Sequence, residues 1–177
     1  APFFGLDMQS LEEAEYKLKH NLWDSKQDVF PWLEAAYMNF FRAAYLEESI
    51  KFALLIFFCA RLANMNEPMD ALVYGAAIGL GYAAHENIGW VQWCRYGTED
   101  CQVWDMIKVR YYPLVMHLGF GVVMGFFLSQ SLFAERSFFK RRIMIILSLL
   151  VPVTFHGVYN YEQTFATFPL LTALLHC

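Results

Sequence analysis

Long apolar segments dominate the hydrophobic pattern of this 177-residue chain. A helix needs roughly 20 mostly apolar residues to cross a hydrocarbon core about 30 Å thick. Four segments meet that requirement, at residues 39–62, 69–93, 111–134 and 143–161, and a fifth, at residues 165–177, has the composition of a spanning helix cut short. The pattern therefore predicts an all-α fold, a polytopic transmembrane helix bundle with at least four spanning helices and an incomplete fifth.

The first 38 residues follow a different pattern, rich in Glu, Lys and Asp and without a long apolar run. Ser10 followed by Glu13 is a capping-box pattern, and the residues that would then share one helix face are apolar: Leu11, Ala14, Leu18 and Leu22. We expect an amphipathic helix that ends near Trp23 and lies at the membrane surface. The chain thus divides into an interfacial region, residues 1–38, and a helix bundle, residues 39–177.

The composition supports a membrane location and argues against one class of partner. Hydrophobic residues make up 58% of the chain and charged residues 17%, whereas about a quarter of a soluble domain is charged. The net charge is −4, and no basic patch with interleaved aromatic residues occurs. We therefore expect a lipid bilayer as the environment and no nucleic-acid partner.

The densest basic cluster lies between the third and fourth segments and sets the expected orientation: Arg136, Lys140, Arg141 and Arg142. Because Lys and Arg are enriched in cytoplasmic loops, we expect residues 136–142 in the cytoplasm and, by alternation, residues 94–110 and the N-terminal region outside. Cys94 and Cys101 share that outer loop, where a disulfide could persist. Two free thiols are the alternative.

Polar side chains interrupt each of the four segments. A charged group inside a spanning helix costs at least a few kcal/mol, so each one is a candidate for function. At a rise of about 1.5 Å per residue, helices that alternate in direction bring these groups to one layer in the outer half of the membrane. The candidates are Glu47, Glu48, Lys51, Glu86, Asn87, His117, His156 and Asn160.

Residue spacing supports a shared cavity, although each pattern also has a purely structural explanation. Glu47 and Lys51 are four residues apart, as are His156 and Asn160, so each pair shares a helix face. The glutamates could instead form a buried ion pair that only fixes helix register, and a lone His117 could be a packing residue. The second and third segments also carry GxxxG spacings, typical of closely packed helices: Gly75 and Gly79, Gly121 and Gly125.

Several motifs occur in a fixed order along the chain. They are Glu47-Glu48-Ser49-Ile50-Lys51, an EExxK motif, then Glu86-Asn87, then His117 with Gly121 and Gly125, and finally His156-Gly157-Val158-Tyr159-Asn160. This ordered set, over about residues 45–161, resembles the PrsW family of bacterial membrane proteases, which is related to the CAAX prenyl endopeptidases. One departure is Trp90, which stands where the family's ENxxY pattern has Tyr.

The resemblance implies a multi-helix intramembrane peptidase, a hydrolase described either as metal-dependent or as glutamate-type. The family's namesake makes the first cut in a membrane-bound anti-sigma factor, so the implied substrate is a membrane-anchored protein. Carried over residue by residue, the family's motif residues fall on Glu47, Glu48, Lys51, Glu86, Asn87, His117, His156 and Asn160. Of these, we expect catalytic roles for Glu47, Glu48, Lys51 and Asn160 and metal ligation by Glu86, His117 and His156.

Two mechanisms use these residue types. In the first, Glu47 or Glu48 is the general base, and the two histidines with Glu86 hold a zinc ion that keeps an open position. In the second, no metal is needed, because the glutamate deprotonates water while the histidines and Asn160 stabilise the oxyanion. A polytopic ion- or proton-binding transporter or receptor is the alternative from another class, but internal repeats would then be expected and we find none.

We expect a multi-pass protein of the cell membrane with its active site towards the outer face.

Overall fold

A computed structural model describes residues 31–97, 102–134 and 137–165, and the regular structure in these ranges is entirely helical. The all-α prediction is therefore confirmed. The predicted amphipathic helix near residues 10–23 and nearly all of the fifth segment lie outside the described residues. The elements are α2 (Pro31–Ala36), η1 (Tyr37–Tyr45), α3 (Leu46–Phe57), η2 (Cys59–Arg61), α4 (Pro68–Gly97), α5 (Val103–Val109), α6 (Tyr111–Leu132) and α7 (Phe138–Phe165).

Helical structure begins earlier than the first apolar segment. The π-helix η1 continues directly from α2 and runs on into α3 without leaving the helical region of backbone conformation. Residue 38, the predicted boundary between the interfacial region and the bundle, therefore lies inside a continuous helix. π-Helices are rare, and the single-turn π-bulges in which they usually occur are frequent at functional sites.

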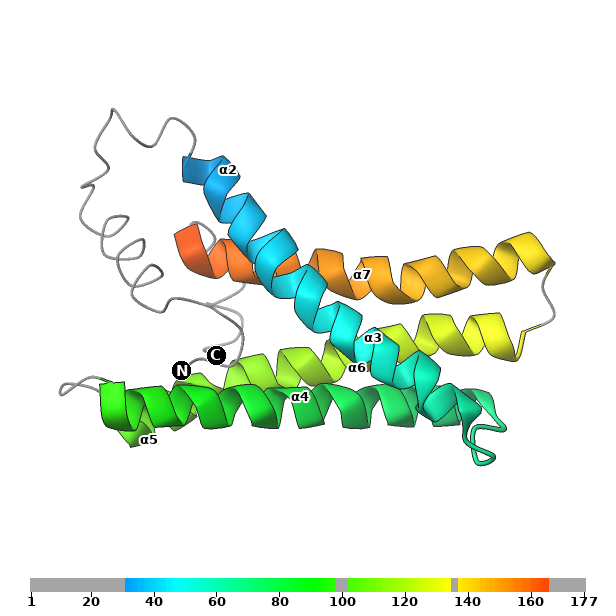
Figure 1. Cartoon of the computed structure of the whole chain (residues 1–177), viewed down its shortest axis with the longest axis horizontal. Coiled ribbons are helices and arrows are strands. Elements are labelled where there is room, and N and C mark those ends of the chain that lie inside the picture. The colour runs from blue at the N-terminus through cyan, green and yellow to red at the C-terminus, as the bar shows by residue number, and fades with distance from the viewer. Residues whose placement is uncertain (1–30, 98–101, 135–136, 166–177) are drawn as a thin grey trace, which may run out of the picture.

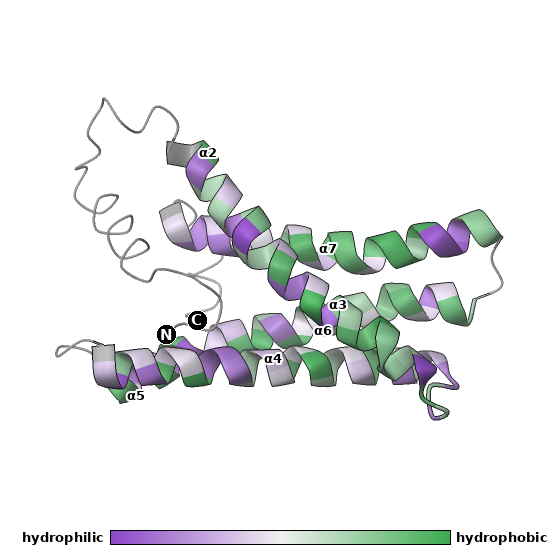
Figure 2. Cartoon of the chain, viewed as in Figure 1, coloured by the Kyte–Doolittle hydropathy of each residue, from purple (hydrophilic) through white to green (hydrophobic). Residues whose placement is uncertain are grey.

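Two stretches in the described part of the chain are long and apolar enough to cross a membrane, Val103–Leu132 and Phe138–Thr164. The first two predicted segments also form helices, but α3 and α4 carry charged residues in their interiors, which lower their hydropathy. Figure 2 shows hydrophobic residues predominating along the middle of α7. The count of at least four spanning helices stays a prediction.

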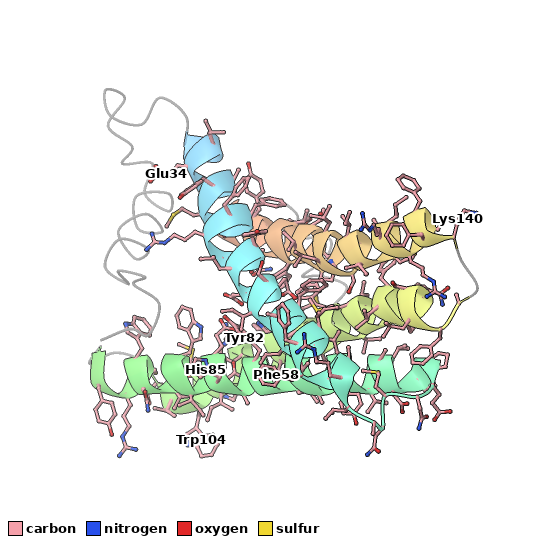
Figure 3. The ribbon with its side chains drawn as sticks, turned by 45° about the vertical axis from the view of Figure 1, so that its right-hand side comes forward. Glu34, Phe58, Tyr82, His85, Trp104 and Lys140 are labelled. Atoms are coloured by element: carbon pink, nitrogen blue, oxygen red, sulfur yellow. The ribbon has the colours of Figure 1, made fainter. Side chains whose placement is uncertain are left out.

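The long helices pack so that the motif-bearing segments are neighbours. Figure 1 shows α4 and α6 lying side by side and α7 packed along α6, while the continuous α2–η1–α3 helix crosses them obliquely, with η1 against α7 and α3 approaching α4. The end of α4, the start of α6 and the end of α7 share one end of the bundle. Lys140 of the basic cluster lies at the opposite end (Figure 3).

Glycines set the distance between α4 and α6. A Cβ atom on Gly121 would clash with the backbone carbonyl oxygen of Gly75, and one on Gly79 would clash with the carbonyl oxygen of His117. The two backbones can approach this closely only because neither residue has a side chain, as the GxxxG spacing predicts. The backbone of His117 is therefore held directly against α4.

A small apolar core lies next to the polar candidates. Leu55 of α3 packs with Met124 and Leu128 of α6, and all three are fully buried. Leu55 follows Lys51 by one helical turn, and Met124 follows His117 by two turns. The core therefore seals the polar cluster on the side of the bundle that carries the basic residues.

The glycine contacts lead to a first prediction. Gly121→Ala places a methyl group against the Gly75 carbonyl oxygen, so it should lower stability by about 1–3 kcal/mol, the usual cost of overpacking. Gly119→Ala on the same helix is the matched control, because its Cβ would meet nothing within 4 Å. Thermal unfolding of the purified variants in detergent measures both, and equal melting temperatures would contradict this account of the packing.

Candidate active site

A fully buried ion pair forms the centre of the polar cluster. Lys51 and Glu48 lie three residues apart on one face of α3, and their Nζ and Oε1 atoms are 2.6 Å apart with both side chains at 0% exposure. The ammonium group also lies 4.8 Å from the centroid of the Tyr82 ring on α4, a cation–π arrangement. Removing one partner of such a pair would leave an uncompensated buried charge, at a cost of about 3–5 kcal/mol. The contact with Tyr82 joins the pair on α3 to α4.

His117 is held by a hydrogen bond at each ring nitrogen. Its Nδ1 lies 2.8 Å from Lys51 Nζ, and its Nε2 lies 2.8 Å from Glu86 Oε2. An ammonium group can only donate, and a carboxylate can only accept. Nδ1 therefore accepts from Lys51, and Nε2 carries the proton that is donated to Glu86, which fixes the tautomer of this histidine.

His156 is bonded on one side only. Its Nδ1 donates to Glu48 Oε1 at 2.8 Å, so in the neutral ring the lone pair sits on Nε2. That nitrogen faces Glu47 Oε2 at 3.9 Å, too far for a direct hydrogen bond. Glu47 Oε2 is itself buried and has no hydrogen-bond partner among the described residues. Two acceptors thus face each other across a space that needs a donor or a cation.

A small cavity lies at this point. It has a volume of about 50 Å³, which is enough for an ordered water when polar partners are present. Its walls come from α3, α4, the α5–α6 junction, the start of α6 and the end of α7, and the lining includes Glu47, Glu86, Arg110, His117, His156, Tyr159 and Asn160. Asn160 thus faces the same space as His156, one helical turn away.

Three side chains are grouped closely enough to hold a metal ion. Glu47, His117 and His156 each offer one ligand atom, and these atoms all lie within 4.8 Å of one another. Two histidines and a carboxylate are a usual set for catalytic zinc. The predicted ligand set had Glu86 in place of Glu47, but Glu86 is engaged with other partners in this structure.

Glu86 contacts two hydrogen-bond donors and one cation. His117 Nε2 lies at 2.8 Å, Trp90 Nε1 donates to Oε1 at 3.0 Å, and Arg110 Nη2 forms an ion pair with Oε2 at 2.7 Å. Asn87 accepts a hydrogen bond at its Oδ1 from Arg110 Nε, at 2.8 Å. Trp90, the departure from the ENxxY pattern, still places a hydrogen-bond donor one turn after Glu86.

Of the predicted residues, five line this cavity: Glu47, Glu86, His117, His156 and Asn160. The other three do not. Glu48 and Lys51 lie behind the cavity walls, and Asn87 is joined to the cluster only through Arg110. Arg110 itself is absent from the predicted set. Its sequence position, just before an apolar segment, is that of an ordinary loop cation, and its local sequence carries no signal that distinguishes it.

The outer loop was expected to contain either a disulfide or two free thiols. Cys94 is buried and disulfide-bonded. Cys101 lies outside the described residues, so its pairing with Cys94 stays a prediction.

Comparison with known proteins agrees with the motif order. A model of the PrsW family of intramembrane metalloproteases matches residues 18–176. This chain belongs to the PrsW family. Protease PrsW of Bacillus subtilis (strain 168) is 34% identical over 129 residues, which cover 72% of this chain and 55% of the relative. Protease PrsW of Geobacillus kaustophilus (strain HTA426) is 35% identical over 122 residues, 69% of this chain and 50% of the relative.

More distant PrsW relatives match as well. Protease PrsW of Clostridioides difficile (strain 630) is 27% identical over 137 residues, 77% of this chain and 56% of the relative. The chain thus spans about half the length of the curated relatives that it matches. No solved structure matches it. The resemblance predicted from the motifs is confirmed at the level of the family.

Proposed function

We propose that this chain is a PrsW-type intramembrane endopeptidase that hydrolyses a peptide bond of a membrane-anchored protein. The observation that carries the proposal is Glu47 Oε2, a buried carboxylate oxygen without a hydrogen-bond partner among the described residues, which faces His156 Nε2 at 3.9 Å across a polar cavity. The matched relatives are themselves named proteases. A water in this cavity would lie against a carboxylate oxygen that is free to accept its hydrogen bond, which is the arrangement that a general base requires.

The chain's own residues can carry out the whole reaction. Glu47 removes a proton from water as the water oxygen bonds to the scissile carbonyl carbon. The Asn160 amide, on the wall of the same cavity, donates to the oxygen on which negative charge develops. Glu47 then passes its proton to the leaving nitrogen as the C–N bond breaks, which yields a carboxylic acid and an amine and restores the site.

The remaining charged residues hold this arrangement in place. Glu48 fixes the ring of His156 from its Nδ1 side, and Lys51 joins Glu48 to His117. Of the two glutamates that the sequence offers as bases, Glu47 is therefore the base in this proposal, and Glu48 is a positioning residue with Lys51.

A zinc ion fits the same donor set. Glu47 Oε2 and His156 Nε2 have no strong partner, and His117 could ligate by exchanging one of its two hydrogen bonds. The cluster also contains three carboxylates, Glu47, Glu48 and Glu86, against the cations Lys51 and Arg110. When bound, zinc would polarise the scissile carbonyl and lower the pKa of water.

The central experiment compares cells that produce the wild-type chain with cells that produce Glu47→Gln. New protein N-termini are identified by N-terminal labelling and mass spectrometry. The amide is isosteric but cannot accept a proton from water, so we expect cleavage of single-span membrane proteins in the wild type and a loss of at least about 100-fold in the variant, at the lower end of a general base's contribution.

Glu67→Gln is the matched control, because Glu67 is an exposed glutamate at the start of α4. It should cleave like the wild type. Normal cleavage by Glu47→Gln, at an unchanged protein level and melting temperature, would exclude Glu47 as the base.

Metal dependence is tested on the purified protein by elemental analysis. If zinc is the resident metal, the wild type should contain about one ion per chain, and His156→Ala should fall well below that value because one of only three protein ligands is lost. His85→Ala, a change of an exposed histidine outside the cavity, is the control. Stoichiometric zinc in His156→Ala would exclude this residue as a ligand, and a metal-free active wild type would favour the glutamate-only mechanism.

The scissile bond is expected in the outer half of the membrane. Arg110 and Pro113, at the start of α6, line the cavity, whereas the apolar core around Leu55 closes the opposite side. The basic residues lie at that opposite end, which the charge rule places in the cytoplasm. Water and the substrate's outer segment would therefore reach Glu47 from the outer face.

Orientation is tested with single cysteines at two exposed positions, Gln102 before α5 and Lys140 at the start of α7, after the four native cysteines are replaced by Ser. In intact cells, an impermeant maleimide should label residue 102 and leave residue 140 unlabelled until the membrane is disrupted. The reverse pattern would invert the topology and move the proposed cleavage to the inner half.

A further inference from the structure

Arg110 occupies a position that neither the motifs nor the proposed chemistry accounts for. It lies at the junction between α5 and α6, where it caps the end of α5. Its side chain is nevertheless only 12% exposed and lines the catalytic cavity. A charged side chain withdrawn this far from solvent needs compensating partners.

The partners of Arg110 are three residues within about one turn of α4. Its Nη2 forms the 2.7 Å ion pair with Glu86, and its Nε donates to Asn87 Oδ1 at 2.8 Å. The guanidinium carbon lies 5.3 Å from the centroid of the Trp90 ring. A planar, forked cation is suited to such a set of contacts, whereas a lysine ammonium can satisfy only one or two of them.

His117 connects the contacts of Arg110 to the cavity, because its ring is bonded to Glu86 and lines the cavity wall. Glu86 accepts the Nε2 proton of this ring, and Lys51 donates to its Nδ1. The ring is thus held between a carboxylate and an ammonium, and the carboxylate is in turn held by Arg110. Without Arg110, Glu86 would lose its cation and could turn away, which would free the His117 ring on the side nearest the mouth of the cavity.

We propose that Arg110 is a positioning residue of the active site, which clamps Glu86 and Asn87 and thereby fixes the orientation of His117 at the cavity. This inference rests on the proposed peptidase function. It also assigns a role to the α5–α6 junction, because the outer loop then contributes one arm of the active site.

The same short helix provides a matched control. Lys108, two residues before Arg110, is paired with Asp105 at 2.9 Å, but both side chains are largely exposed, at 76% and 68%. An exposed pair of this kind contributes little to stability. Removing Lys108 deletes the same charge from the same element without touching the cavity.

The test measures kcat and KM separately, on a single-span reporter protein that carries a cleavage sequence found with the wild-type enzyme. Arg110→Gln should lower kcat at least about tenfold and leave KM within about threefold, because misplacement of a catalytic group slows the chemical step. Arg110→Lys should recover part of kcat, and Lys108→Gln should match the wild type. A rise in KM at unchanged kcat would instead assign Arg110 to substrate binding and overturn the proposal.

A second measurement does not depend on activity. Melting temperatures in detergent are compared for Arg110→Gln, Glu86→Gln and the double variant. Because the two side chains interact directly, the double variant should be destabilised by clearly less than the sum of the single effects. Additive effects would overturn the clamp even if the wild type cleaved no reporter, whereas an inactive wild type with a coupled pair would count against the peptidase function and leave the clamp supported.

Discussion

Buried charge that has to be compensated inside an apolar helix bundle is the constraint on which this structure depends. Lys51 is fully buried, and its ammonium is satisfied by Glu48, by His117 Nδ1 and by the face of the Tyr82 ring. These partners come from three different helices, α3, α6 and α4. A slip of α3 by one turn would carry Lys51 and Glu48 together away from His117 and Tyr82, in a medium where water cannot replace the lost contacts. The polar cluster therefore specifies the helix register as much as it serves chemistry.

Close packing of α4 on α6 makes that compensation geometrically possible. Gly75 and Gly121 let the two backbones meet, and Gly79 lies against the carbonyl oxygen of His117. At this separation the Glu86 carboxylate of α4 reaches His117 Nε2 directly, at 2.8 Å. The glycines thus affect the site indirectly, because they set the distance between α4 and α6 at which Glu86 can bond to His117.

Much of the site could be predicted from the sequence, because motif order and depth along each helix place Glu47, His117 and His156 in one layer. Sequence could not decide between Glu47 and Glu48, since adjacent helical residues point about 100° apart and either could face the cavity. The sequence analysis named Glu86 as the carboxylate ligand beside the two histidines, whereas the structure groups Glu47 with them. Glu86 is paired with Arg110, and that contact depends on how the α5–α6 junction folds back on α4. Long-range contacts of this kind leave no periodic signal.

The geometry around Glu47 also indicates how the site would support the proposed hydrolysis in a place where water is scarce. Glu47 Oε2 and His156 Nε2 are both acceptors at 3.9 Å, and the His156 ring cannot turn away cheaply, because it is held through Nδ1 by Glu48, which is itself held by Lys51. The cluster is left with one carboxylate more than it has cations and with a cavity of about 50 Å³ at that point. A donor, either water or a cation, completes the arrangement with little reorganisation, and a site organised in advance around the reacting molecule is what lowers a barrier most in a low-dielectric medium. The burial that makes these charges costly therefore also holds their side chains in the arrangement that a bound water or cation needs.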